Sequence, residues 1–501
     1  MQEESFQSRY VVKILSSIVI AVLNVVIQML LPRALSVEEF GYYSYNLNVF
    51  TSTVVLANLS MSNALVAKFS KRNDEIGLVC FYLKYYFFEI IILSLGLLVL
   101  YPIKLAQNTF SGQTILMTLL GLEAAAVIKF LSDVVSIYDA MAIAKRSAVF
   151  QIVLKILVCI FVIASYFCGK LNLSVFYMGQ IILTFGIASV LLMMVLKYQK
   201  NKYQMWKADR FCNYVREYTI FCKPLVISNI VSQVIIIIMN WCLMRFSGVT
   251  GQAIFGAAWQ LNALVTYVFS PYAELSKREY SVVSGDIDKL KGFYCNSLKR
   301  MFWLTAYFAC FIGFCNDWIL NIVYGDKYSG AGMVTLLIML YTIYQAWGQM
   351  CGSFMLATEK TKMNAVLGII GQIVTLVLVF IFQIPNVIWP SGLGAIGIAL
   401  VYVVGNFISV SISIIATTRV LKMNSLRILS IQILPMLLCS GVSFMLNYIL
   451  NTLILGSDLM NSLLKLFVAG VVYTIVIVTV VWIWPSQIAM SRKQLLQLVR
   501  K

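Results

Sequence analysis

Five charged side chains fall deep inside long apolar stretches of the sequence, away from the ends of the stretches, where a charge is costly and usually functional. Lys129 and Asp133 are four residues apart, so on a helix they share a face and can pair. Glu123 lies in the same stretch, Glu89 in the stretch before it and Lys155 in the stretch after it. All but Glu123 are expected at similar depth. Two interpretations remain open. One is a structural ion-pair cluster. The other is a cationic, hydrated wall that holds an anion, with Asp133, Glu89 and Glu123 pairing charge or coupling an ion.

Several other chemistries are excluded by composition. The chain has no histidine, which removes imidazole acid–base catalysis, Ser–His and Cys–His nucleophile pairs and most zinc sites. Its 11 cysteines are scattered through apolar runs without a CxxC pair and are interpreted as small buried side chains. Glycine-rich phosphate loops are also missing. The sequence therefore predicts a protein that is not an enzyme, with no cofactor and no metal.

The elements that position these charges are predicted to be membrane-spanning helices. Of the 501 residues 61% are hydrophobic and 12% are charged, which exceeds the apolar content of a soluble protein. A spanning helix needs about 20 mostly apolar residues. Fourteen such segments are expected, near 10–31, 42–67, 80–100, 113–138, 149–168, 174–196, 219–244, 251–273, 300–320, 330–356, 363–385, 392–418, 428–449 and 461–484. The fold class is therefore an all-α polytopic membrane protein with about 14 transmembrane helices.

The distribution of basic residues predicts the topology. An even number of spans places both termini on one side, and most of the 38 Lys and Arg residues lie in the loops and helix ends on that side. The positive-inside rule makes that side cytoplasmic, which also explains the net charge of +18 without a nucleic-acid partner. The expected divisions are an N-lobe at 1–200, a basic cytoplasmic linker at 201–218, a C-lobe at 219–420, and a final pair of helices with a basic tail at 421–501.

An internal repeat relates the two lobes. The first span carries Asn24 and Gln28, and the seventh carries Asn229, Gln233 and Asn240, each set on one helical face. Similar turns follow spans one and seven and spans four and ten, so the offset is six spans each time. Parallel repeats with a site between them are a transporter design. The sequence predicts two pseudo-symmetric six-helix bundles with a polar cleft between them, followed by a C-terminal hairpin.

Polar stripes lie on two further spans. Asn48 and Asn58 share a face of the second span, and Gln345 and Gln349 share a face of the tenth. These amides either hydrogen-bond between helices or line a cavity where they bind sugar hydroxyls. The aromatic side chains that could stack on sugar rings, with ordinary packing as the alternative, are Trp259, Tyr267 and Trp347.

Three turns resemble one family of transporters. The segment LPRALSVEEFGYYS at 31–44 resembles the first outer turn of polysaccharide flippases, which belong to the multidrug/oligosaccharidyl-lipid/polysaccharide exporter superfamily. The turns at 271–277 and 357–362 are similar to that family too. Arg33 belongs to the matched motif and is expected either to anchor to lipid phosphate or to guide substrate. Gly41 of the same motif is expected to take a backbone conformation closed to other residues, and Arg245 lies in the corresponding turn after span seven.

The resemblance implies a flippase of the bacterial inner membrane that works by alternating access. Its substrates would be undecaprenyl-pyrophosphate-linked oligosaccharide repeat units, moved from the cytoplasmic to the outer leaflet for O-antigen or capsule assembly. The expected partners are this lipid-linked oligosaccharide, membrane lipid, a polysaccharide polymerase and a chain-length regulator, with the chain acting as a monomer and without nucleic acid. The residues expected to bind the substrate diphosphate are Lys129, Lys155, Arg33 and Arg245.

Three alternatives stay open. A flippase for lipid II or a teichoic-acid precursor fits the same features. A drug/cation antiporter of the same superfamily would use Glu89, Glu123 or Asp133 to bind H⁺ or Na⁺. A membrane glycosyltransferase, polymerase or ligase is the least compatible, because the predicted outer loops are too short to gather catalytic residues.

Overall fold

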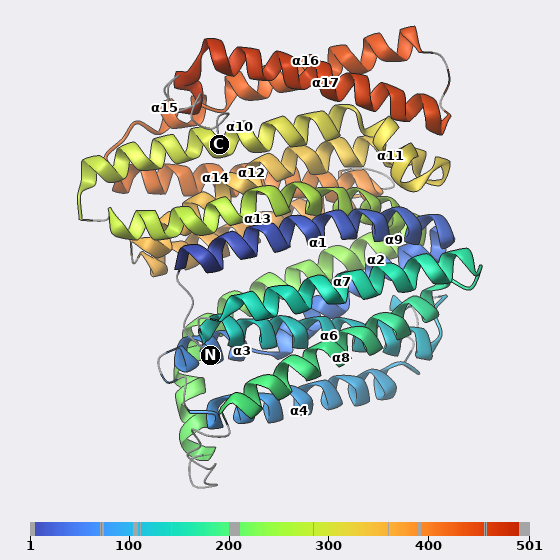
Figure 1. Ribbon diagram of the computed structural model, residues 1–501, viewed down its shortest axis with the longest axis vertical. Helices are drawn as coiled ribbons and strands as arrows, with labels where there is room; N and C mark the ends of the chain where they lie inside the picture. The colour runs from blue at the N-terminus through green and yellow to red at the C-terminus, as the bar shows by residue number, and fades with distance from the viewer. Residues whose placement is uncertain are drawn as a thin grey trace. The chain divides into compact units, whose positions relative to one another are not determined.

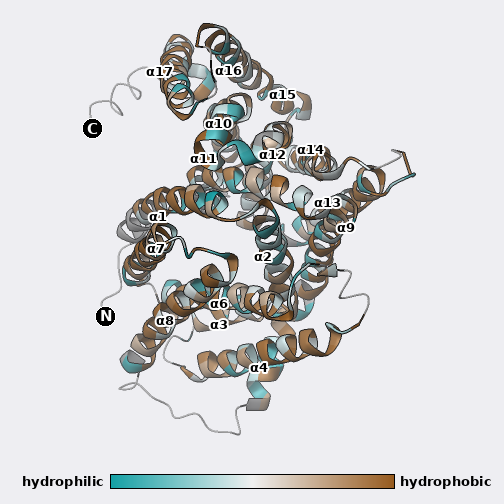
Figure 2. Ribbon diagram, turned by 90° about the vertical axis from the view of Figure 1, so that its right-hand side faces the viewer, coloured by the Kyte–Doolittle hydropathy of each residue, from teal (hydrophilic) through white to brown (hydrophobic). Residues whose placement is uncertain are grey.

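The computed structural model describes residues 6–489 except 71, 73–74, 104–108, 111, 142, 200–210, 284, 359, 389–391, 455 and 457. All regular secondary structure in these described ranges is helical (Figure 1). Figure 2 shows that apolar residues dominate the long helices. Such helices suit lipid, because a helix satisfies its own backbone hydrogen bonds where water is absent. The predicted all-α polytopic fold is confirmed.

Each expected span has a helical counterpart. The helices are α1 (Phe6–Ala34), α2 (Val37–Ala57), α3 (Met61–Phe69), α4 (Gly77–Leu100), α6 (Ile115–Ala140), α7 (Ala144–Phe167), α8 (Leu173–Gln199), α9 (Phe211–Val282), α10 (Ile287–Phe314), α11 (Asn316–Tyr324), α12 (Gly332–Ala357), α13 (Thr361–Gln383), α14 (Gly394–Val420), α15 (Ser425–Ser430), α16 (Ile433–Leu453) and α17 (Leu459–Ile483). Short 3-10 turns cover Asp326–Ala331 and Pro485–Ile488. By length and composition 10 helices can cross a membrane, or up to 12 if each of two bent helix pairs is one span. One of these segments, Val226–Ser270, contains a break at Gly248, and α12 is long enough but is interrupted by glutamines. If the two parts of Val226–Ser270 are counted as separate spans and α12 is counted as one more, the described helices account for the fourteen expected spans.

Two of the spans are broken rather than straight. The second is two helices, α2 and α3, bent by 59° around Leu59 and Ser60, both of which have positive φ. The expectation of one continuous helix over 42–67 is therefore wrong. The pair α10 and α11 is bent by 75°. The break in α9 at Gly248, where φ is 68°, instead separates spans seven and eight. A broken helix exposes backbone groups inside the membrane, so such positions need local hydrogen-bond partners.

The chain forms two compact units, Met1–Ala253 and Ile254–Lys501. In the first unit α6 packs on α4 and α8, and α7 packs on α8. In the second unit α12 packs on α10 and α14, and α13 packs on α14. These are the same pairs displaced by six spans, which agrees with the predicted repeat.

Additional segments complete each unit. The first unit includes the start of α9, whose Tyr214, Tyr218 and Cys222 join a buried apolar core with α2, α3, α4, α6 and α8. Of the expected linker 201–218, residues 201–210 lie outside the described residues, and 211–218 already belong to α9. In the second unit α16 and α17 lie side by side and pack on α10 and α11 (Figure 1).

Gly41 allows α2 to approach the break in α9 within the first unit. It is helical rather than in a positive-φ turn, so the expected reason for a glycine here is wrong. A Cβ at this position would lie 2.3 Å from the Val249 carbonyl oxygen and 2.5 Å from the Val249 Cγ1 atom. The glycine is therefore required by close packing of backbone against backbone.

Replacing Gly41 by alanine is expected to lower the free energy of unfolding by about 1–3 kcal/mol, because the added methyl group must push the two segments apart. Thermal unfolding in detergent measures this effect. Gly96→Ala in α4 is the control, since nothing lies within 4 Å of its added Cβ. Equal melting temperatures for the two variants would contradict the close-packing explanation.

Candidate functional site

Lys129 and Asp133 form the ion pair that their spacing predicts, with side chains 15% and 5% exposed. The Tyr82 hydroxyl of α4 donates a hydrogen bond to the other Asp133 oxygen at 2.5 Å. One Asp133 oxygen is therefore paired with the charged ammonium group of Lys129, and the other accepts from the neutral hydroxyl of Tyr82. Asp133 would keep the Tyr82 hydrogen bond if Lys129 turned to another anion.

The same chain of hydrogen bonds continues to a second buried carboxylate. The Asn58 amide donates to the Tyr82 hydroxyl at 3.1 Å and to Glu89 Oε2 at 3.3 Å, and its carbonyl oxygen accepts from the Ser62 amide at 3.1 Å. Asn58 and Glu89 are 1% and 6% exposed. Glu89 Oε1 has no hydrogen-bond partner within the described ranges. We call Lys129, Asp133, Tyr82, Asn58 and Glu89 the charge network.

The charge network depends on the break in the second span. Asn58 follows the last residue of α2, and the positive-φ residues Leu59 and Ser60 redirect the chain into α3. Its side chain is thereby used inside the network rather than on an open cavity surface. Sequence reasoning missed Tyr82, although its spacing of seven residues from Glu89, two helical turns on one face, was a usable signal.

Lys155 and Glu123 are not bonded to the charge network. Lys155 of α7 is half-buried and makes no hydrogen bond or ion pair with another described residue. Glu123 accepts a hydrogen bond from the Ser94 hydroxyl at 2.8 Å. Within the spanning helices of the first unit, Lys129 is therefore paired, and Lys155 has no partner among the described residues.

Three of the remaining polar candidates of the first unit join α2 to α9. The Asn48 amide donates to Asn240 Oδ1 at 3.3 Å, and the Asn229 amide donates to the Val55 carbonyl oxygen at 3.1 Å. Three further polar candidates are half-buried, namely Asn24, Gln28 and Gln233. Of the two arginines Arg33 is half-buried and Arg245 is exposed.

In the second unit Gln345 and Gln349 of α12 are half-buried. Gln349 Oε1 accepts from the Ser270 hydroxyl at 3.4 Å, while Gln345 Oε1 has no partner among the side chains and backbone described. Trp347 is fully buried and packs edge-on against Phe302, so it cannot stack on a ligand.

An ionic cluster ties α9 to α3 at one end of the first unit. Glu217 accepts from Lys68 at 3.3 Å and from Arg72 at 2.5 Å, and the Tyr214 hydroxyl donates to Glu75 at 2.7 Å. The hydrogen bond from Arg72 holds the pKa of the Glu217 carboxyl below its ordinary value. We call Lys68, Arg72, Glu75, Tyr214 and Glu217 the ionic latch.

Because the folded-state pKa of Glu217 is lowered, the latch should be complete above the ordinary glutamate value of about 4.3 and should weaken as pH falls through the lowered value. After correction for the pH dependence of intrinsic amide exchange, hydrogen exchange over 211–223 is therefore expected to stay constant from pH 8 to 5 and to rise only below the ordinary glutamate pKa. Glu217→Gln should increase that exchange several-fold at neutral pH without unfolding the chain, since partly exposed ion pairs contribute little to global stability. Arg216→Gln, an exposed neighbour, is the control. Unchanged exchange in Glu217→Gln would exclude a latch.

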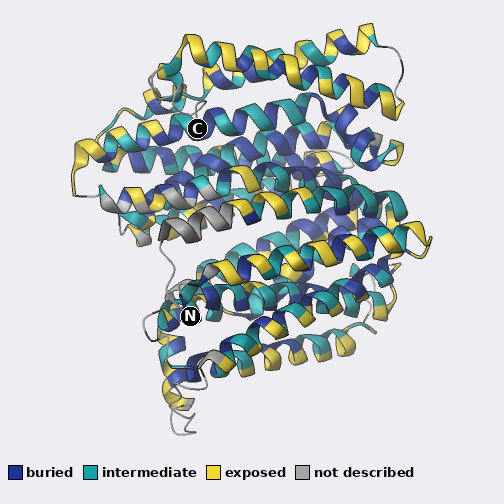
Figure 3. Ribbon diagram, viewed as in Figure 1, coloured by how far each residue is buried: buried dark blue, intermediate teal, exposed yellow. Residues whose placement is uncertain are grey.

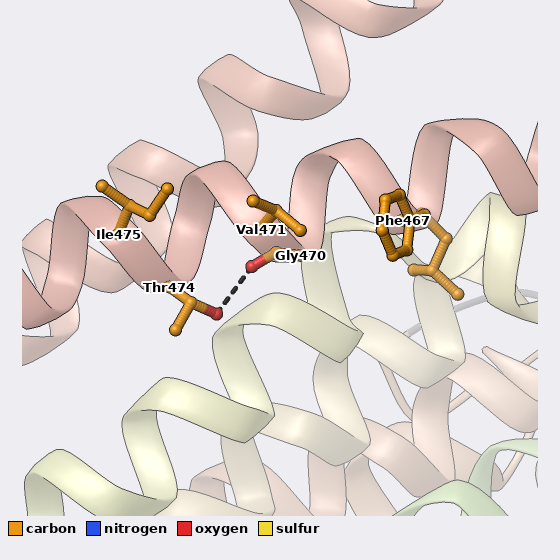
Figure 4. Close-up of a pocket in the computed structure, with 6 residues that line it drawn as sticks. Phe467, Gly470, Val471, Thr474 and Ile475 are labelled. Carbon is orange, nitrogen blue, oxygen red and sulfur yellow. Dashed lines mark hydrogen bonds between the residues drawn. The ribbon is translucent and has the colours of Figure 1, made fainter. Parts of the chain in front are cut away.

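The second unit carries an apolar groove on α17. It is a shallow, open hollow of about 510 Å³ and is lined by Leu466, Phe467, Gly470, Val471, Thr474 and Ile475. Figure 4 shows the Thr474 hydroxyl turned back to the Gly470 carbonyl oxygen, with which it makes a hydrogen bond of 2.6 Å. The helices α4, α16 and α17 expose many apolar side chains (Figure 3). A groove of this composition suits a hydrocarbon chain.

Lys465 lies one residue from this groove and is 5% exposed. Its ammonium group donates to Asn451 Oδ1 at 3.0 Å and to the Gly456 carbonyl oxygen at 3.1 Å. It therefore fastens the turn between α16 and α17.

Known structures share this fold. A structure of the lipid II flippase MurJ in an inward closed conformation matches with a TM-score of 0.66 and 16% identity, over 93% of this chain and 98% of that chain. A multidrug resistance MATE family transporter of the MOP superfamily matches in an inward-facing conformation with a TM-score of 0.63 and 14% identity, over 80% and 95%. A multidrug resistance MATE family transporter of the same superfamily in an outward-facing conformation matches with a TM-score of 0.56 and 11% identity, over 82% of this chain and 94% of that chain. No family model matches the chain, and no curated protein sequence matches it either.

These matches define the class. The chain is a multi-pass membrane protein with the fold of MOP-type transporters and flippases, and its structural neighbours are transporters rather than enzymes. At identities of 11–16% the likeness establishes the fold alone.

Proposed function

We propose that the chain is a flippase of the bacterial inner membrane for undecaprenyl-pyrophosphate-linked oligosaccharide repeat units, which it moves to the outer leaflet by alternating access. The observation that carries the proposal is that Lys129 and Lys155 lie within spanning helices of the first unit. A substrate diphosphate brings about two negative charges into a region with little water, so the protein must supply counter-charge. Lys155 offers an ammonium group without a partner among the described residues. Lys129 offers an ammonium group that can leave Asp133, because Asp133 still accepts a hydrogen bond from the Tyr82 hydroxyl.

In this mechanism Asp133 neutralises Lys129 while the site is empty. Substrate diphosphate would draw Lys129 away, and the Tyr82 hydroxyl would continue to stabilise Asp133. Lysine acts here as a point charge that needs no bidentate geometry. Arg33 and Arg245 would guide the diphosphate at the outer side, with both termini in the cytoplasm. A polysaccharide polymerase and a chain-length regulator would receive the product, and the substrates would serve O-antigen or capsule assembly.

Liposomes test the proposal directly. The purified chain is reconstituted with radiolabelled undecaprenyl-diphospho-N-acetylglucosamine, and galactosyltransferase with UDP-galactose is added outside. The fraction of lipid that the enzyme can reach should rise from about half to nearly all, and empty liposomes should stay near half. An undecaprenyl glycoside without the diphosphate should move much more slowly. Equal accessibility with and without the chain would overturn the proposal.

A flippase for lipid II or a teichoic-acid precursor is the second candidate, and the extent of the MurJ match favours it over drug export. That match spans 93% of this chain, whereas the MATE matches leave about a fifth unmatched. Replacing the probe by lipid II in the same liposomes distinguishes the two lipid substrates. Ethidium uptake against a proton or sodium gradient tests the drug antiporter.

A further inference from the structure

Three aromatic rings from three helices form a cluster in the second unit. Trp259 of α9 lies 5.6 Å from Tyr341 of α12 and 4.9 Å from Tyr402 of α14, and the two tyrosine rings are 5.1 Å apart, all between ring centroids. Phe255, 2% exposed, stacks on Trp259 and Tyr402 at 5.6 and 5.8 Å. The three rings themselves are only half-buried. We call Trp259, Tyr341 and Tyr402 the aromatic platform.

Amide side chains lie one helical turn from two of these rings. Gln345 follows Tyr341 by four residues and Asn406 follows Tyr402 by four, so each amide shares a helical face with its ring. The Asn406 amide donates to the Tyr341 carbonyl oxygen at 3.4 Å, which ties the two faces together. Gln345 Oε1 is shielded from solvent and accepts no hydrogen bond within the described ranges. An acceptor left open in such a place is costly unless a donor reaches it.

This combination matches the chemistry of a sugar ring. The apolar C–H face of a sugar packs on aromatic rings, and its hydroxyl groups donate to and accept from amides. Pure core packing looks different in the same unit, where Trp347 is fully buried against Phe302.

An organic cation is a poorer fit. Helices α12 and α14 contain no carboxylate, and on the part of α9 after Trp259 the first is Glu274. At 1.5 Å per residue those fifteen positions place it roughly 22 Å along the helix.

We propose that the aromatic platform, with Gln345 and Asn406, binds a neutral sugar ring of the lipid-linked substrate. This inference rests on the proposed function, because it assigns the sugar moiety of that substrate to the second unit. Specificity for the sugar would then come from residues separate from the lysines assigned to the diphosphate.

Two probes separate sugar recognition from diphosphate recognition. The full chain in lipid nanodiscs, free of sugar detergents, is titrated with farnesyl diphosphate and with farnesyl-diphospho-N-acetylglucosamine by calorimetry. The wild type should bind the sugar-bearing probe about tenfold more tightly, the scale of one ring stack with a hydrogen bond. Trp259→Ala should abolish that preference and leave farnesyl diphosphate binding unchanged. Trp259→Phe should keep most of the preference, and Gln345→Met should reduce it.

Tyr344→Ala is the matched control. Tyr344 packs edge-on against Phe407 at 5.2 Å and joins the same two helices, α12 and α14, outside the platform. A preference lost equally in Tyr344→Ala and Trp259→Ala would assign the platform to packing alone. If Trp259→Ala does not fold, Gln345→Met and Trp259→Phe decide the question.

The two probes distinguish a failure of the platform inference from a failure of the proposed function. Equal wild-type affinity for both probes would overturn the platform inference and leave diphosphate binding intact. Binding of neither probe would overturn the proposed function itself. Tetraphenylphosphonium binding that Trp259→Ala removes would show a cation site instead and would contradict the sugar assignment.

Discussion

Lys129→Glu is expected to reduce lipid transport in the liposome assay by more than a hundredfold. The substitution places a third carboxylate beside Asp133 and Glu89 and repels the substrate diphosphate. Lys129→Arg should be partly active, because it keeps the charge, and Lys129→Ala should be impaired. Asp133→Asn should be milder than Lys129→Glu, since the positive charge remains and the Tyr82 hydroxyl can still donate to the amide oxygen. The measurement is the initial rate of sugar accessibility at equal amounts of reconstituted protein.

A purely structural ion pair would behave differently, because breaking a buried pair by removing one partner costs about 3–5 kcal/mol, whereas removing both is often neutral. Lys129→Met would then lower the amount of folded protein, and the double variant Lys129→Met with Asp133→Asn would restore both protein and transport. The proposed function requires that the double variant fold and still fail to transport. Normal transport by the double variant would contradict a role for Lys129 in diphosphate binding.

Lys155→Met is expected to reduce transport at least tenfold while leaving thermal stability unchanged or raised. Lys155 has no hydrogen bond or ion pair within the described part of the chain, so its ammonium group contributes desolvation cost without a compensating partner. A residue retained for binding often lowers stability in this way. Lys155→Glu should abolish transport, and Lys155→Arg should retain part of it.

The control for Lys155 is Lys465→Met, which removes a buried lysine that already has two hydrogen-bond partners. That substitution should lower the melting temperature, because the Gly456 carbonyl oxygen loses its donor and Asn451 Oδ1 keeps only the Trp318 indole N–H. A fall in stability for Lys155→Met comparable to that of Lys465→Met would identify Lys155 as structural. Normal export by Lys129→Glu and Lys155→Glu together would exclude a cationic site in the first unit.

Features that depend on neighbours within one helix were available from the sequence. The long apolar runs predicted the spanning helices, since burying a backbone in lipid leaves few alternatives to a helix. The four-residue spacing of Lys129 and Asp133 predicted their ion pair, because 3.6 residues per turn place them together whatever surrounds the helix. The six-span offset of the similar turns predicted the repeated helix pairs.

Features that depend on packing between distant segments came only from the tertiary structure. Glu217 meets Lys68 across 149 residues of sequence, and Tyr82 meets Asp133 across 51. Gly41 was expected in a turn but is required by Val249. Asn58 joins the charge network only because the chain bends at Leu59 and Ser60, and three rings become a platform only because α9, α12 and α14 pack together. Helical periodicity fixes which side chains share a face of one helix, whereas the partner that each face meets is decided by the close packing of whole helices.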